Sequence, residues 1–326
     1  MDHKIIDCGN GFWNLRGSFK IAGMLDIGTQ ASLVKLSDGR FVFLDSYTLT
    51  PEQRAEVDAI TGGKVAAVLN THPFHTVHVE AMQAAFPEAK HYGTARHLEK
   101  FPHLKWEALR VEDPALWAEF APDLEFSVPD GVLFIHPNEH IHCSSVLVWH
   151  PASRSLHVDD TFGMLPAKGL RKKPKISVHP TLRFALEKRA GAAKEFRAWG
   201  ADLLARWDNP NWLCAAHSGA LSSDQIAGGS VGDGLKGAMK AAENTLKTRS
   251  EMGRIRRQTI SQTTAQPGTA ALAPGLRSAA PLPRFEHGPQ NAANNAPAGG
   301  TFQLFHQRRA QPVAHLTGHR AAARAG

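Results

Sequence analysis

The sequence Thr71-His72-Pro73-Phe74-His75-Thr76-Val77-His78 places three histidines within seven residues. It directly follows the apolar run Val65–Leu69, which is typical of a buried strand. Neutral imidazole is the commonest metal ligand of proteins near neutral pH. The end of a strand is also rigid enough to aim several side chains at one point. The stretch therefore predicts a metal site at a strand end, provided that other parts of the chain supply further ligands.

The positive charge of the chain lies at its C-terminal end. The net charge of the 326 residues is +7, and the segment from Glu251 onward holds nine arginines, no lysine and two acidic residues. This segment accounts for the whole net charge, so the first 250 residues are neutral overall. A neutral domain lacks the positive field that steers nucleic acid onto a protein. We therefore expect no nucleic-acid partner, and the sequence leaves the oligomeric state open.

Cys8, Cys143 and Cys214 are the three cysteines of the chain, and no CxxC pair occurs. An odd, sparse count argues against a disulfide framework and a thiolate zinc site, and it fits a reducing compartment. The first residues lack the basic and apolar regions of a signal peptide. No apolar run approaches the roughly 18 to 20 residues that span a bilayer. We therefore expect a cytoplasmic protein without a membrane span, in which Cys143 is a small buried hydrophobe that points away from the face of His142.

Apolar runs and turn signals predict alternating strands and helices over the first 250 residues. Thr50 and Pro51 are typical of a helix start, and Asp38-Gly39 is typical of a hairpin turn. The expected strands cover 12–15, 19–21, 32–36, 41–44, 65–69, 132–136, 145–149, 156–158 and 212–216. The expected helices begin near 51, 79 and 95 and cover 180–207 and 235–246.

The composition changes beyond about residue 250, where Ala, Pro, Gly, Gln, Asn and Thr dominate without periodicity. Such a segment cannot bury enough apolar surface to offset the entropy cost of ordering it. We therefore divide the chain into a domain over 1–250 and a disordered Arg/Ala/Pro-rich tail over 251–326.

Side chains that can bind a metal follow several separate strands of this pattern. In chain order they are Asp45, then His72, His75 and His78, then His140 and His142, then Asp160, and finally His217. In layered α/β folds, the loops at strand ends are where sites assemble. Histidines together with a carboxylate suit zinc, manganese or iron. We expect a solvated surface position for eight further histidines, His3, His97, His103, His179, His287, His306, His315 and His319.

At these positions the sequence resembles the metallo-β-lactamase-fold hydrolases. Thr71-His72-Pro73 resembles the start of the T-H-x-H-x-D-H motif of that family, and His142 is similar to the histidine of its third motif. The run from His157 to Phe162 resembles the strand that ends in the bridging aspartate, here Asp160, and Ala216-His217-Ser218-Gly219 resembles the last motif, a G-H-G-like turn. The strand that ends at Asp45 resembles an early family strand whose aspartate supports the site. Order and spacing agree over roughly residues 10 to 220. The resemblance implies an α/β fold, the αββα four-layer sandwich, with the metals at one edge of the two sheets.

The first motif departs from the family pattern. If one residue is inserted after Pro73, His72, His75 and His78 all match family ligands and Val77 replaces the aspartate. If none is inserted, only His72 matches. Either register loses the aspartate that ligates the second metal and helps to handle the proton in the family. The resemblance then implies one or two divalent ions, zinc first and iron or manganese otherwise, on His72, His75, His78, His142, Asp160 and His217.

These residues predict a metal-dependent hydrolase whose substrate is a small molecule. The expected reaction is attack by a metal-bound hydroxide on an ester, lactone, thioester or phosphoester. The lost aspartate favours an alternative, a catalytically silent relative that binds metal or a ligand without hydrolysing it. An iron-dependent oxidoreductase on the same fold is the third alternative, since three histidines and a carboxylate also suit iron. The sequence leaves the substrate open, because loops set the pocket and the fold alone does not fix the function.

Overall fold

Two mixed β-sheets carry the strands that lead to the predicted ligands. The first sheet has the order β1-β2-β5-β6-β7-β8, and its strands are β1 (Lys4–Asp7), β2 (Phe12–Gly17), β5 (Thr29–Lys35), β6 (Phe41–Leu44), β7 (Val65–Leu69) and β8 (Lys90–Tyr92). The second has the order β15-β14-β11-β10-β9, and its strands are β9 (Glu125–Ser127), β10 (Leu147–His150), β11 (Ser155–Asp159), β14 (Trp212–Ala215) and β15 (Gly219–Ser222). Two short antiparallel pairs complete the strands, β3 (Lys20–Ile21) with β4 (Leu25–Asp26) and β12 (Phe162–Leu165) with β13 (Lys175–Val178).

The structure is a computed structural model that describes residues 3–21, 24–168, 172–227 and 229–264, all of which belong to one unit, Met1–Pro267. Its helices are α1 (Pro51–Thr61), α2 (Val79–Ala85), α3 (Ala95–Lys100), α4 (Pro114–Phe120), α5 (Leu182–Ala185), α6 (Ala192–Arg206) and α7 (Val231–Thr264), with a 3₁₀ turn at Ser223–Gln225. None of the helices in these ranges combines the length and the apolarity that a membrane span requires.

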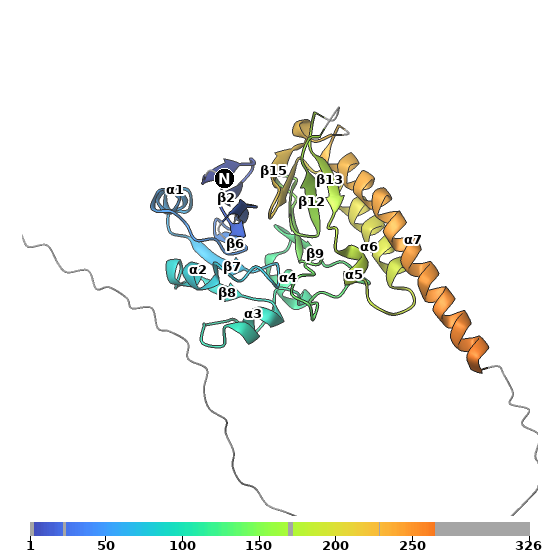
Figure 1. Ribbon diagram of the computed structural model, residues 1–326. Helices are drawn as coiled ribbons and strands as arrows, with labels where there is room; N and C mark the ends of the chain where they lie inside the picture. The colour runs from blue at the N-terminus through green and yellow to red at the C-terminus, as the bar shows by residue number, and fades with distance from the viewer. Residues whose placement is uncertain (1–2, 22–23, 169–171, 228, 265–326) are drawn as a thin grey trace, which may run out of the picture. The chain divides into compact units, whose positions relative to one another are not determined.

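Alternation of side chains along the strands builds four layers. Val42 and Leu44 of β6 point into the core between the sheets, where they join Val148 of β10. The intervening Phe43 points outward and packs with Val57 of α1. On the second sheet, Leu213 of β14 and Leu156 of β11 belong to the core that contains Phe196 of α6 and Leu235 of α7. Figure 1 shows α6 and α7 beside the second sheet and α1 and α2 beside the first. The αββα sandwich that the resemblance predicts is therefore confirmed.

Local signals explain where several elements begin and end. The Thr50 side chain accepts the Gln53 N–H, and the Gln53 side chain accepts the Thr50 N–H, so a capping box starts α1 at Pro51 as predicted. Gly62 ends α1 in the left-handed region with φ 57°. The Asp38-Gly39 turn joins β5 and β6 as an antiparallel pair, also as predicted.

Other predicted elements differ from the structure. The strand expected over 132–136 is absent there, and Val132 makes only an isolated bridge with Leu186. The single helix expected over 180–207 is two helices, α5 and α6, because Gly191 precedes α6 with φ 94°. The last helix runs to Thr264, since residues 251–264 hold good helix formers and no proline. The rest of the predicted tail, 265–326, lies outside the described residues.

The topology brings the ends of four strands to one place. β6 pairs with β7 in parallel, and β11 pairs with β14 in parallel, so each pair delivers its following residues to the same edge. Arg16 of β2 connects the two sheets near this edge. Its buried guanidinium donates to the carbonyl oxygens of Ala215 and Ala216 at 2.9 Å each, directly before His217. Burial lowers the pKa of Arg16 to about 10, so it is still charged near neutral pH.

Candidate metal centre

Four histidines surround the carboxylate of Asp160 at this edge. The Oδ2 atom of Asp160 lies 3.5 Å from Nε2 of His72 and 3.5 Å from Nε2 of His75. The same oxygen lies 3.7 Å from Nδ1 of His142, and Oδ1 lies 3.7 Å from Nε2 of His217. The structure thus brings five of the six predicted ligands together around one aspartate, from both sheets and from the loop before β10.

Burial and charge set the ionisation of this cluster. Burial raises the pKa of the Asp160 carboxyl, but its contacts with His142 and His75 outweigh this effect and hold that pKa well below its usual range. Burial lowers the pKa of His72 well below 6.5, so this imidazole is neutral near pH 7. His75 is buried too, yet Asp160 and Asp45 raise its pKa well above 6.5. In the metal-free protein, His75 is therefore the proton carrier of the cluster.

Hydrogen bonds on the far side of two imidazoles fix which nitrogen faces Asp160. His75 donates from Nδ1 to Oδ2 of Asp45 at 3.0 Å, and His217 donates from Nδ1 to the carbonyl oxygen of Gly28 at 2.7 Å. In the neutral ring of His217 this leaves an unprotonated Nε2 on the Asp160 side, whereas Nε2 of His75 carries a proton near pH 7 because the pKa of that residue is raised. Such carboxylate or carbonyl partners are the usual support of metal-binding histidines. These hydrogen bonds therefore aim Nε2 of His75 and Nε2 of His217 toward Asp160, an arrangement that could hold a metal.

His72 is held in the other tautomer. The backbone N–H of Phe74 donates to Nδ1 of His72 at 3.2 Å, so the neutral ring carries its proton on Nε2. Ligation through Nε2 would require that proton to leave and Nδ1 to become protonated, which would release the contact with Phe74. His72 therefore needs a local rearrangement that His75 and His217 do not.

The donor set suits a divalent transition metal. The Nε2 atoms of His72 and His75 are buried and have no hydrogen-bond partner among the described residues. Burying a polar atom without a partner costs free energy, and a metal ion between these nitrogens and Asp160 would remove that cost. The ligand atoms of these three residues lie within 4.8 Å of one another. His72, His75 and Asp160 therefore fit such an ion, with His142 and His217 beside them.

A buried polar network supports the centre from behind. Thr71 donates from its N–H to Oδ1 of Asp45 at 2.7 Å and lies with its hydroxyl 2.6 Å from Oδ2 of Asp159. His157 lies with Nε2 3.0 Å from Oδ1 of Asp159. Asp45 and Asp159 have φ of 63° and 42°, a left-handed conformation that costs non-glycine residues about 1–3 kcal/mol each. Their carboxylates also lie near His75, but Thr71 and His157 already occupy them, so we assign them a supporting role.

His78 lies outside this cluster. Its Nδ1 lies 2.8 Å from the hydroxyl of Thr48, and its ring lies against Tyr47 with centroids 5.5 Å apart. Val77, at the place of the motif aspartate, is 66% exposed and faces solvent. Glu80, the other nearby carboxylate, pairs with His103 at 2.9 Å on the surface. Neither Val77 nor Glu80 therefore brings a carboxylate to the cluster around Asp160.

Sequence reasoning missed several residues around the centre. The expectation that His97 is a solvated surface residue is wrong: its side chain is fully buried, and burial lowers its pKa to about 4. His179 is also not a free surface residue, because it lines the cavity beside Asp160. Asp159 also escapes prediction as a supporting residue, although the Asp159-Asp160 pair after the apolar strand is a visible signal in the sequence. The expectation that Cys143 is a buried hydrophobe is confirmed, since it belongs to the core with Leu147 and Phe196, and burial and the Asp160 charge raise its pKa to about 12.

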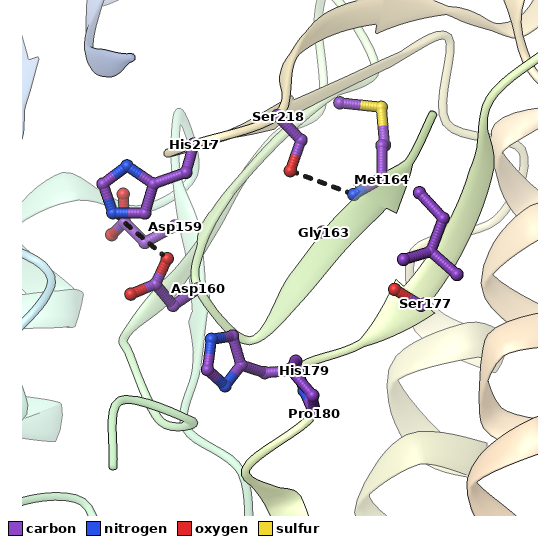
Figure 2. A pocket seen from close by; sticks show the side chains of 10 residues that line it. Asp159, Asp160, Gly163, Met164, Ser177, His179, Pro180, His217 and Ser218 are labelled. Atoms are coloured by element: carbon purple, nitrogen blue, oxygen red, sulfur yellow. Dashed lines mark hydrogen bonds and ion pairs between the residues drawn. The ribbon is translucent and has the colours of Figure 1, made fainter. Parts of the chain in front are cut away.

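A cavity of about 190 Å³ adjoins the cluster. Figure 2 shows Asp160 and His217 on one side of it, with the His179 ring pointing toward Asp160. Nδ1 of His179 accepts the N–H of Thr181 at 3.4 Å and lies 2.8 Å from its hydroxyl. The neutral His179 ring therefore carries its proton on Nε2 and can donate it to a bound group. The remaining walls are Asp159, Gly163, Met164, Leu165, Ser177, Pro180 and Ser218.

Among known proteins, this chain is similar in fold to several solved structures. No family model and no curated protein matches the chain. A metallo-β-lactamase from Erythrobacter litoralis is 14% identical, with coverage of 74% of this chain and 96% of that one and a TM-score of 0.49. A metallo-β-lactamase from Pontibacter korlensis is 13% identical, with coverage of 76% and 99% and a TM-score of 0.45. The metallo-β-lactamase DIM-1 is 13% identical, with coverage of 74% and 99% and a TM-score of 0.47.

Identity and TM-scores at this level carry no argument about chemistry. The chain is an αββα sandwich with a histidine and aspartate cluster at the edge where its two sheets meet.

Proposed function

We propose that the protein is a metal-dependent hydrolase whose centre is the cluster around Asp160. The observation that carries this proposal is the convergence of four imidazole nitrogens within 3.7 Å of one carboxylate. Two of these nitrogens are buried without a hydrogen-bond partner among the described residues. A cluster that is built only for stability would satisfy its buried polar atoms within the protein.

The residues that would hold the metal are His72, His75, His142, Asp160 and His217. When bound there, a divalent ion lowers the pKa of water toward about 7 and polarises a carbonyl or phosphoryl oxygen. Zinc is our first choice because imidazole and carboxylate ligands suit it, and iron and manganese are the other candidates. Three free buried cysteines support a reducing, cytoplasmic location as part of the proposal.

His179 is the side chain that we assign to the substrate. Its Nε2–H is free to donate to a substrate oxygen in the cavity, because Thr181 occupies Nδ1. Burial lowers the pKa of His179, so the ring stays neutral near pH 7 and acts as a donor without adding charge. Met164, Leu165 and Pro180 give the cavity an apolar wall. These features support a small substrate with an ester, lactone or thioester carbonyl over a phosphoester.

Metal analysis and turnover test the proposal together. Protein purified without a histidine tag should contain or take up about one equivalent of zinc, manganese or iron. A panel of lactones, thioesters and phosphodiesters should then include a substrate whose turnover disappears in His72→Ala and His217→Ala. The matched control is His103→Ala, which removes an exposed histidine paired with Glu80. Metal content below a third of an equivalent, unresponsive to added ions, would refute the proposal.

A second function, metal or ligand binding without hydrolysis, is favoured by one observation. Val77, at the position of the motif aspartate, is apolar and 66% exposed, so it can neither bind a metal nor handle a proton. A protein that takes up metal but turns over no member of the panel would support this second function. Iron content together with oxygen consumption would instead support the oxidoreductase alternative.

A further inference from the structure

Phe74 lies in the part of the first motif whose spacing is irregular, and its ring touches two of the proposed ligands. The ring stacks on the imidazole of His142, with centroids 5.2 Å apart and planes inclined by 19°. It also lies 5.9 Å from the ring of His72, at an inclination of 55°. The backbone N–H of the same residue donates to Nδ1 of His72. Phe74 therefore contacts both His72, which follows a strand of the first sheet, and His142, which lies in the loop before β10.

His142 is the ligand that the backbone fixes least. No helix or strand lies between β9, which ends at Ser127, and β10, which begins at Leu147. Its side chain is 35% exposed, against 0% for His72, 21% for His75 and 28% for His217. Unlike His75 and His217, it has no hydrogen bond to a carboxylate or carbonyl behind the ring among the described residues. Its orientation must therefore come from packing.

Arg96 of α3 also contacts the Phe74 ring. Its guanidinium lies over the Phe74 ring, 4.8 Å from the centroid. The same guanidinium forms an ion pair with Glu139, three residues before His142 in the chain. Stacking between aromatic rings and between arginine and a ring favours fixed geometry as well as burial. The loop that carries His142 is thus held at two points, at Glu139 by Arg96 and at His142 by Phe74. Arg96 and Phe74 also contact each other.

We propose that Phe74 is a positioning residue, which orients the imidazole of His142 so that Nδ1 faces Asp160. The inference rests on the proposed function in that Asp160 is the centre of a metal site. It assigns a role to the insertion that breaks the motif: the extra residue supplies an aromatic support where His142 lacks a hydrogen-bonding one. Loss of that support frees the ring to rotate, so a metal then has to order His142 when it binds.

The variants Phe74→Leu and Phe74→Tyr test this role. Leucine keeps an apolar side chain but removes the ring, whereas tyrosine keeps the ring. The matched control is Phe184→Leu, which removes a ring that is 48% exposed and lies under Arg183 at 4.3 Å, at a site remote from the ligands in sequence and outside the cavity lining. Thermal unfolding of the metal-free proteins checks that all three variants fold.

The first measurement needs no metal. In the metal-free wild type, the ring current of Phe74 should shift the His142 ring protons in the NMR spectrum. The shift should remain in Phe74→Tyr and in Phe184→Leu and disappear in Phe74→Leu. If the His142 resonances are the same in Phe74→Leu as in the wild type, Phe74 does not orient His142 and the proposal is overturned.

The second measurement is the affinity for zinc ion alone, in competition with a chelating dye. Phe74→Leu should bind zinc about 10-fold or more weakly, in the range seen when the support of a ligand is removed. Phe74→Tyr and Phe184→Leu should bind zinc like the wild type. Equal zinc affinity in Phe74→Leu and wild type also overturns the proposal. A wild type that binds no zinc, manganese or iron refutes the proposed function, and the NMR shift still decides whether Phe74 orients His142.

Discussion

Nδ1 of His75 lies 3.0 Å from Oδ2 of Asp45, although the two residues follow different strands of the first sheet. Asp45 is 2% exposed and His75 presents its other nitrogen to Asp160. The carboxylate therefore acts on the centre through the imidazole, by fixing its tautomer and raising its basicity.

Asp45→Asn should lower zinc affinity by about 10- to 100-fold, because the amide keeps the shape but removes the charge that supports His75. Competition with a chelating dye measures the change. Asp38→Asn is the control, since Asp38 is an exposed aspartate that pairs with Arg40 before the start of β6, at the opposite end of that strand from Asp45. Unchanged affinity in Asp45→Asn would show that the carboxylate does not act on the centre.

The pH dependence of the metal-free protein should carry the signature of His75. Its pKa in the folded state is raised well above 6.5, so protonation stabilises the fold. This contribution is fully present below about pH 6.5 and is lost as the pH rises through the folded pKa. We expect the urea midpoint of the wild type to fall over this range relative to His75→Gln. Parallel midpoints of the two proteins from pH 6 to 9 would contradict the assignment.

The same proton should compete with the metal. Zinc must displace it from Nε2 of His75, so zinc affinity should rise with pH above 6.5 until the folded pKa of His75 is passed. Calorimetric titration in buffers of different ionisation enthalpy would count the protons released. A proton count of zero near pH 7 would mean that His75 is not a ligand.

Val77→Asp should leave the metal stoichiometry unchanged, even though it restores the motif aspartate in the sequence. Val77 is 66% exposed, so a carboxylate there would lie in solvent rather than beside His75. Elemental analysis after zinc loading and dialysis measures the stoichiometry. A gain of a second equivalent of zinc would show that this segment can turn toward the centre, as the register with an inserted residue implies.

His179→Leu should weaken the binding of acetohydroxamate to the zinc-loaded protein by about 10-fold, the worth of one hydrogen bond to a charged group. The reason is the loss of the Nε2–H donor in the cavity. His179→Gln keeps an N–H donor and should bind the probe more tightly than the leucine variant. Zinc content should be the same in all three proteins. Equal affinities for acetohydroxamate in the wild type and His179→Leu would show that His179 does not bind the substrate.

The elements that form from local signals were predictable from the sequence. The capping box at Thr50 fixes the start of α1, and the apolar run before Asn70 fixes β7. Because strands deliver their next residues to a sheet edge, His72, Asp160 and His217 could be placed near one another from sequence order. The layers followed from the resemblance of these same motifs.

The remaining features depend on tertiary contacts that leave no periodic signal. The segment 132–136 has the apolar character of a strand but finds only one bridge partner, so it stays irregular. His97 and His179 lie on segments whose environment is set by distant loops, so their burial could not be read from neighbours in the chain. The role of Phe74 was invisible for the same reason, because Arg96, Glu139 and His142 reach it from other segments.

The hydrogen bonds of Arg16 to Ala215 and Ala216 have a consequence for the order of assembly. Two of the proposed ligands, His72 and His75, precede β9, and the other three, His142, Asp160 and His217, follow it, so neither sheet alone would hold a complete centre. The hydrogen bonds of Arg16 to Ala215 and Ala216 can form only when the sheet that contains β14 packs against the sheet that contains β2. The same packing brings Asp160 and His217 next to His72 and His75. A metal that binds this arrangement stabilises the docked pair of sheets by mass action. Metal uptake during refolding would therefore report the moment at which the two halves of the sandwich join.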